Sequence, residues 1–127
     1  MNNGQRGFTL VELMIALAII AVLSAVAIPF YKQYVYQARR AEAQTALMGI
    51  AMDETEYYQD NYTYSSLTLP TLTYYSLAFS STPTATSFTA TATAIGSQSK
   101  DLDCLTLSIN QLGIKSATGS GSNCWGN

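Results

Sequence analysis

The chain has 127 residues, a formal net charge of −2 and 11% charged residues. It contains no histidine, which excludes Ser-His-Asp and Cys-His catalysis and every histidine-based metal site. The small acidic excess gives no reason to expect an electrostatic footprint for nucleic acid, so we do not expect this chain to bind DNA by itself.

The N-terminus combines a short polar leader with a long apolar segment. Arg6 and Gly7 end the leader, and the run from Leu13 to Phe30 carries no charge. At about 1.5 Å of rise per helical residue, the stretch from Phe8 to Phe30 extends roughly 34 Å, which exceeds a bilayer core of about 30 Å. We therefore predict a leader over 1–7, a hydrophobic membrane helix over 8–30, and an amphipathic helix with a globular head over 31–127.

Glu12 lies just inside the membrane segment. A carboxylate near the bilayer centre costs about 2.5 kcal/mol or more, whereas each Leu, Ile or Val contributes about −0.3 to −0.6 kcal/mol. The segment should insert despite Glu12, but the carboxylate needs a partner, and nothing basic lies near it in the helix. The alternative is that Glu12 reaches the interface with its side chain and has no further role.

A cleaved secretory signal is another interpretation of the apolar run. No small-x-small cleavage site follows the run, and the chain continues smoothly into a helix, which argues against that interpretation. The unusual feature comes before the run, where a basic leader ends in glycine.

The stretch Gly7-Phe8-Thr9-Leu10-Val11-Glu12-Leu13 resembles the processing motif of type IV prepilins and of the pseudopilins of type II secretion. The resemblance implies cleavage after Gly7 by a membrane prepilin peptidase, and N-methylation of the new terminal amine on Phe8. It also implies a partner for Glu12, which is the Phe8 amine of a neighbouring subunit in the filament.

The side of the membrane on which the head lies is not fixed by charge. Arg6 precedes the span and Lys32, Arg39 and Arg40 follow it, so the positive-inside rule is undecided. The cysteine pair and the resemblance both place the C-terminal part outside. The implied localisation is the bacterial inner membrane with a periplasmic C-terminal domain, and then the extracellular pilus.

Pro29 lies inside the expected helix, where it removes one backbone donor and crowds the carbonyl of Ala25. We expect a helix kink at this position, although Pro29 could simply mark the membrane exit. Many type IV pilins have proline here, and the stretch before it can lose helicity in the filament. Many members also have glycine where this chain has Ala21.

The helix is expected to continue as an amphipathic segment that ends near Asp60-Asn61. An apolar stripe at helical spacing suits packing under a sheet: Ala43, Leu47, Ile50, Ala51 and Tyr58. Polar residues are expected on the other faces: Lys32, Gln33, Arg39, Arg40 and Glu42.

Alternation with a period of two after Pro70 predicts strands. We place them around Tyr75–Phe79, Phe88–Ala94, Leu105–Ile109 and Leu112–Ser116, with a polar loop over Gly96–Asp101. Short connections favour an antiparallel meander. The expected fold class is α+β, with a long N-terminal helix packed against a small antiparallel sheet and a C-terminal disulfide loop.

Cys104 and Cys124 are the only cysteines. In an exported head the default interpretation is one disulfide. It would tie back the stretch Gly119–Asn123, which cannot form a stable element unaided. Two free buried thiols are the alternative if the C-terminus stays in the cytoplasm.

The acidic residues of the head form no recognisable catalytic pair. Asp53, Glu54 and Glu56 cannot share one helix face, so we expect a solvated surface. Asp101 and Asp103 are a weak candidate for calcium, which takes six to eight oxygen ligands, and loop solvation is the alternative. We expect no enzymatic activity, no cofactor and no metal site.

The function that the resemblance implies is assembly. The chain is expected to be a structural subunit of a type IV pilus, assembled with other pilin subunits by the inner-membrane machinery. It looks most like the short accessory (minor) pilins, which support pilus biogenesis, adhesion, twitching or DNA uptake. One alternative is a type II secretion pseudopilin. Another is a ligand-binding module, an adhesin or DNA receptor, that acts through the loop between Cys104 and Cys124, where only Lys115 is basic.

Overall fold

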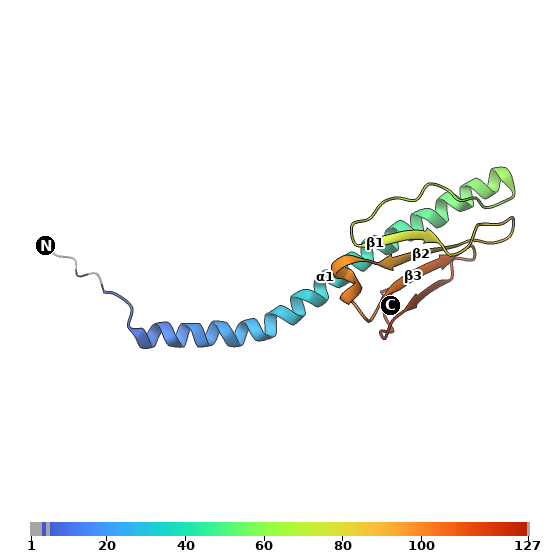
Figure 1. Cartoon of the computed structure of the whole chain (residues 1–127). Coiled ribbons are helices and arrows are strands. Elements are labelled where there is room, and N and C mark those ends of the chain that lie inside the picture. Colours follow the sequence, from blue (N-terminus) through green and yellow to red (C-terminus); the bar gives the residue numbers. More distant parts are fainter. Residues whose placement is uncertain (1–3, 5, 127) are drawn as a thin grey trace. The chain divides into compact units, whose positions relative to one another are not determined.

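A computed structural model describes residue 4 and residues 6–126 of the chain (Figure 1). It contains one long α-helix, α1, and a four-stranded sheet. The helix spans Leu10–Asn61, and the strands are β1 (Tyr75–Phe79), β2 (Thr89–Ala94), β3 (Thr106–Asn110) and β4 (Lys115–Thr118). A 3₁₀ helix, η1, spans Gly96–Lys100 and connects β2 to β3. The α+β fold class is confirmed.

The chain divides into two compact units between Val35 and Tyr36. The first contains the apolar half of α1, which is continuous through Pro29. Of the predicted leader over 1–7, residues 1–3 and 5 lie outside the described residues. The leader boundary, the membrane segment over 8–30 and the kink at Pro29 stay predictions.

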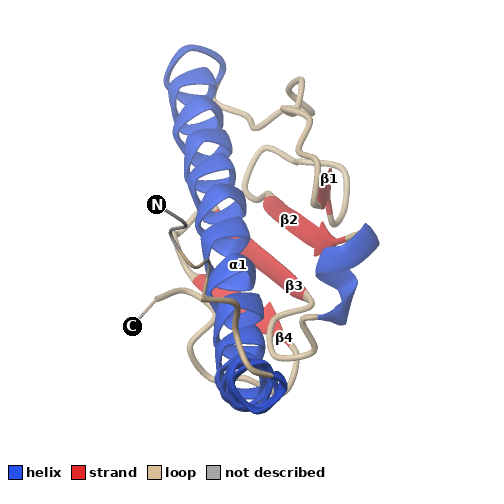
Figure 2. Cartoon of the chain, turned by 90° about the vertical axis from the view of Figure 1, so that its left-hand side faces the viewer, coloured by secondary structure: helices blue, strands red, loops and turns tan. Residues whose placement is uncertain are grey.

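The second unit is the head, in which the second half of α1 covers one face of the sheet (Figure 2). The strands pair antiparallel in the order β1-β2-β3-β4, so the predicted meander is confirmed. In β2, Ala90, Ala92 and Ala94 are buried, while the threonines between them face the other side. Small inward side chains allow the helix to lie close to the sheet, since a larger residue at these positions would overfill the space between them.

The core joins the predicted helical stripe to the inner face of the sheet. Ala43, Leu47 and Ile50 of α1 are buried and belong to the same cluster as Leu107 and Ile109 of β3. Aromatic rings extend this core towards the end of the helix. The Tyr58 and Tyr64 rings stack with centroids 4.7 Å apart, and Tyr64 meets Phe88 edge-on at 5.0 Å.

Three sequence predictions near η1 are wrong. Arg40, expected on a polar face, is buried, and Asp101, expected in a solvated loop, is 3% exposed. The Arg40 guanidinium donates to both carboxylate oxygens of Asp101, through Nε at 2.6 Å and through Nη2. The segment Gly96–Lys100 also forms a 3₁₀ helix instead of an irregular loop. A burial pattern based on polarity alone cannot identify an ion pair between residues 61 positions apart.

A polar network extends from this ion pair. Gln98 Nε2 donates to Asp101 Oδ2 and to the Tyr75 hydroxyl, both at 3.1 Å. The hydrogen bond to Asp101 raises the pKa of Arg40, and burial raises the pKa of Tyr75. The Arg40 guanidinium is therefore held charged and the tyrosine neutral, and the hydrogen bonds of this network fix η1 against the helix.

The fourth strand is displaced from its predicted place. We expected it around Leu112–Ser116, but β4 begins at Lys115 because the turn before it is longer. The Asn110 side-chain oxygen accepts from the backbone N–H groups of Leu112 and Ile114, both at 3.0 Å. Gly113 adopts φ of +71°, which a side chain would disfavour.

The predicted disulfide joins Cys104 to Cys124. It holds a glycine-rich tail against the backbone of residues 102–104. The N–H of Gly121 donates to Asp103 O at 2.9 Å, and a side chain at Gly119 would collide with the same carbonyl. Gln44 Nε2 donates to Cys124 O at 2.7 Å, which ties the end of the tail to α1.

We predict that Cys104→Ser lowers the free energy of unfolding by roughly 3 kcal/mol, because the loop that the disulfide closes in the unfolded chain is lost. Denaturant unfolding of the full chain in detergent, compared with wild type, measures this. Cys124→Ser should give a matching loss, because both variants remove the same cross-link. Full stability in either variant would contradict a structural role for the disulfide.

Candidate functional site

The N-terminus of α1 is closed by a reciprocal pair of hydrogen bonds between Thr9 and Glu12. The backbone N–H of Thr9 donates to Glu12 Oε2 at 2.9 Å, and the Thr9 hydroxyl donates to the same oxygen at 3.1 Å. The backbone N–H of Glu12 approaches Thr9 Oγ1 at 3.2 Å. This is a capping box, with Thr9 as N-cap and Glu12 three residues later.

The capping box revises the expectation that Glu12 has no partner in its own chain. Its carboxylate accepts two hydrogen bonds from Thr9 and lies at the positive end of the helix dipole. Both bonds use Oε2. The capping box is readable in the sequence, because Thr-x-x-Glu before an apolar run is typical of it. It differs from the expected partner of the Glu12 carboxylate, which was a basic group.

Gly7 and Phe8 precede the helix and are accessible. Phe8 is 91% exposed, and a side chain built at Gly7 would meet nothing within 4 Å. An accessible, non-helical backbone is what a peptidase needs at a cleavage site. Cleavage after Gly7, methylation of Phe8 and the pairing of Glu12 with another subunit stay predictions.

The first half of α1 presents apolar side chains without cover. It is the one described helix long and apolar enough to cross a membrane by length and composition, and none of its most apolar window is buried. Large side chains along it are mostly more than half exposed, including Leu10, Ile15, Ile20 and Val26. An apolar surface this long must be covered by lipid or by other apolar helices.

The acidic residues of the head differ from the sequence prediction in one place. Asp53 and Glu56 are exposed as expected, but Glu54 is fully buried. Its Oε2 accepts from the Ser65 backbone N–H at 3.0 Å and so holds the segment that follows the helix. The expectation of one solvated acidic surface is wrong for this residue, because the segment that follows the helix folds back against it.

The calcium candidate is not supported by the geometry. Both oxygens of Asp101 accept from Arg40, and Asp103 Oδ1 accepts from Ser120 Oγ at 3.1 Å. The described residues contain no group of three or more potential metal ligands of the His, Cys, Asp or Glu type.

The described head contains four cationic side chains, and three of them are engaged. Arg40 forms the buried ion pair. The Arg39 guanidinium lies 3.6 Å from the centre of the Tyr74 ring, and Lys115 Nζ lies 5.2 Å from that of Trp125. Lys100, at the end of η1, is exposed.

Two family models match the chain. Residues 29–108 match a family described as "Type IV minor pilin ComP, DNA uptake sequence receptor". Residues 2–28 match the prokaryotic N-terminal methylation motif. The first match spans more than half of the chain, and the second contains Gly7, Phe8 and Glu12.

Curated relatives match mainly through one segment. The chain is 48% identical over 58 residues to the type IV major pilin protein PilE1 of Neisseria gonorrhoeae, which is 46% of this chain and 35% of the relative. It is 46% identical over 56 residues to the fimbrial protein EcpC of Eikenella corrodens, which is 44% of this chain and 37% of that one. The matched part is thus about a third of each relative's length.

Solved structures match almost three quarters of the chain. A type IV pilin from Shewanella oneidensis superimposes with a TM-score of 0.60 and 33% identity, covering 72% of this chain and 99% of that one. The non-core minor pilin PilV of Neisseria meningitidis gives the same TM-score at 22% identity, covering 73% and 96%. At that identity the second match shows the fold alone.

Proposed function

The chain belongs to the type IV pilin family, and from that premise we propose that it is a minor pilin assembled through the first half of α1. Pilins are structural proteins that assemble into pili with other pilins. The observation that carries the proposal is an uncovered apolar helix directly preceded by the Gly7-Phe8 motif. The match to a minor pilin family over residues 29–108 supports the minor role.

The first proposed step is insertion and processing. The apolar half of α1 inserts in the inner membrane with the head on the periplasmic side, where the Cys104–Cys124 disulfide can form. A prepilin peptidase cleaves after Gly7, and the Phe8 amine is methylated. The inner-membrane assembly machinery then moves the subunit into a filament.

The second step is docking through Glu12. Its Oε2 is occupied by Thr9, while Oε1 has no hydrogen-bond partner within the described residues, and the residue is exposed. We assign Oε1 to the Phe8 amine of a neighbouring subunit. In a surrounding of low dielectric such a pair is strong, and an unpaired charge is costly.

The pseudopilin alternative is not favoured by these comparisons, because the family model and the similar structures are pilins. DNA reception is a second candidate, because the matched family is described as a DNA uptake sequence receptor. The charge of the head argues against autonomous binding, since Lys100 is its one described cation without a recorded ion-pair or ring partner.

We predict that Gly7→Leu leaves the leader attached, because a bulky side chain at the cleavage position obstructs the peptidase. Intact-mass measurement of membrane-extracted protein would then show the full leader and an unmethylated chain. Gly4→Leu is the matched control and should be trimmed normally. A trimmed, methylated Phe8 in Gly7→Leu would contradict the proposed processing site.

We predict that Glu12→Gln inserts normally but enters filaments at least about tenfold less, because the charge pair with the neighbour is lost. The amide can still accept from Thr9, since Gln also completes a capping box. The measurement is the fraction in sheared filaments against the fraction in membranes at matched expression.

Thr9→Ala is the control for this experiment. It removes the N-cap, at a cost of about 1 kcal/mol in helix stability, and keeps the charge of Glu12. It should incorporate nearly as wild type does. Equal incorporation of Glu12→Gln and wild type would mean that Glu12 serves as a helix cap alone.

We predict that the purified chain retains little DNA on filters, and equally little for unrelated sequences, because Lys100 is the one described head cation without a partner. A single phosphate contact would make such retention fall only about 3.5-fold between 50 and 200 mM salt. Sequence-dependent retention that persists at 200 mM would establish DNA reception as a function of this subunit.

A further inference from the structure

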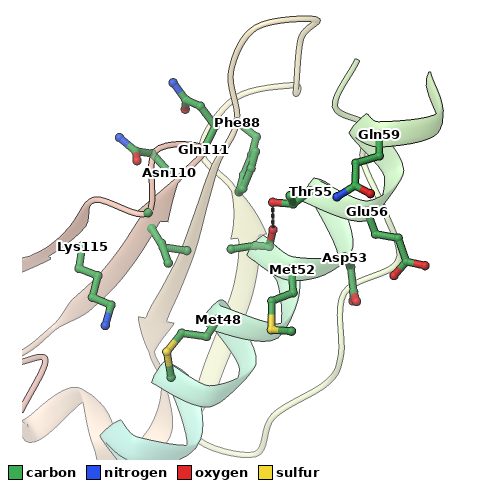
Figure 3. A pocket seen from close by; sticks show the side chains of 13 residues that line it. Met48, Met52, Asp53, Thr55, Glu56, Gln59, Phe88, Asn110, Gln111 and Lys115 are labelled. Carbon is green, nitrogen blue, oxygen red and sulfur yellow. Dashed lines mark hydrogen bonds between the residues drawn. The ribbon is translucent and has the colours of Figure 1, made fainter. Parts of the chain in front are cut away.

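An apolar groove lies between the second half of α1 and the turn that joins β3 to β4 (Figure 3). Its volume is about 750 Å³. Phe88 and Ile109 form its apolar interior from the sheet side, and Met48 and Met52 line it from the helix, where Figure 3 shows both thioethers. Methionine side chains adapt to the shape of an incoming group, which suits a docking surface.

The groove is uncovered in the single chain. Met52 is 72% exposed, and Leu112 and Ile114 of the adjoining turn are 73% and 57% exposed. Two carboxylates, Asp53 and Glu56, stand on the helix side of the groove, and Lys115 stands on the strand side. The groove therefore combines an apolar interior with an acidic rim along the helix.

The other end of the head carries a complementary feature, an apolar side chain beside a cation. Leu102 is 65% exposed, and Lys100 is exposed two residues before it. The backbone here is fixed, because Ser120 N–H donates to Leu102 O at 3.0 Å and Cys104 is in the disulfide. Of the neighbouring acids, Asp101 is neutralised by Arg40, and Asp103 accepts from Ser120.

Leu102 and the groove lie at opposite ends of β3. The strand begins at Thr106, shortly after Leu102, and ends at Asn110, which lines the groove. Five residues of strand span roughly 16 Å, so one head cannot place its own Leu102 in its own groove. An exposed apolar side chain at one end of a molecule and a groove at the other can form a head-to-tail contact between copies, and such a contact can repeat along a filament.

We propose that Leu102 of one copy of this chain inserts into the groove between Met48, Met52 and Ile109 of a second copy. Lys100 then meets Glu56 and Asp53 on the acidic rim. The occupant is a second copy because this one chain carries both halves of the contact, apolar against apolar and cation against carboxylate. The proposal rests on the proposed function, since it describes how two copies of this chain meet where they adjoin in a filament.

Carbodiimide coupling of sheared filaments tests the contact directly, because it joins an amine to a carboxylate only where they touch. We expect a cross-linked dimer whose linked peptides connect Lys100 to Glu56 or Asp53. The opposite placement of these residues rules out the same link within one chain. A link from Lys100 to a different pilin, or none from Lys100 at all, would overturn the proposal.

Variants give a second measurement that does not depend on the coupling chemistry. Leu102→Ala should lower the dimer yield about tenfold, as expected for the central apolar residue of an interface. It should leave folding intact, because the side chain is mostly exposed. An unchanged yield would contradict the proposed insertion of this side chain.

Charge reversal tests the acidic rim. The measurement is the fraction of subunit recovered in sheared filaments, because this fraction does not depend on the amine and carboxylate groups that the variants change. Lys100→Glu and Glu56→Lys should each lower recovery several-fold, and the double variant should restore it. Glu42→Lys is the matched control, because it makes the same charge change at an exposed position on the same helix that does not line the groove. No rescue in the double variant would overturn the charge pairing.

The two proposals fail in different ways. If wild-type chain is absent from sheared filaments, the proposed function is wrong. If the chain is present in filaments but Leu102→Ala and wild type give the same contacts, only the head-to-tail contact is wrong.

Discussion

The first half of α1 has an apolar surface that nothing in the described part of the chain covers, and the proposed function depends on this constraint. Such a helix is stable in a bilayer or in a bundle of similar helices, but not in water. In either apolar setting the exposed backbone N–H groups at the helix start need partners. The Thr9–Glu12 capping box supplies acceptors for two of them, the N–H groups of Thr9 and Glu12, within the chain itself.

The head is a small domain, and its stability depends on several features together. Its helix provides one side of the core, and alanines on β2 allow a close approach. The disulfide then holds a tail that has little apolar surface of its own. The buried pair of Arg40 and Asp101 adds specificity more than net stability, because desolvation offsets much of its Coulomb energy. Its directional hydrogen bonds fix where η1 meets the helix.

The sequence predicted those features that depend on local pattern. Alternation over Tyr75–Phe79 and Thr89–Ala94 identified two strands, and the stripe through Ala43 and Leu47 identified the buried helix face. The burial of Arg40 and Glu54 could not be read in this way. Each is buried by a partner outside its own helix: Asp101, 61 residues later, in one case, and the backbone of Ser65, just after the helix ends, in the other. The capping box was readable from Thr-x-x-Glu, and the groove was not, because it needs three separate segments to meet.

The two carboxylate oxygens of Glu12 explain why a glutamate suits this position better than other capping residues. Oε2 closes the helix start through Thr9, and Oε1 has no hydrogen-bond partner within the described residues. A serine or threonine could not supply both an acceptor for the cap and a charge for a neighbour's amine. In the proposed assembly the same residue would cap the helix of a lone subunit through Oε2 and pair with a neighbour's amine through Oε1. Under that proposal, helix capping and filament docking use different oxygens of one side chain.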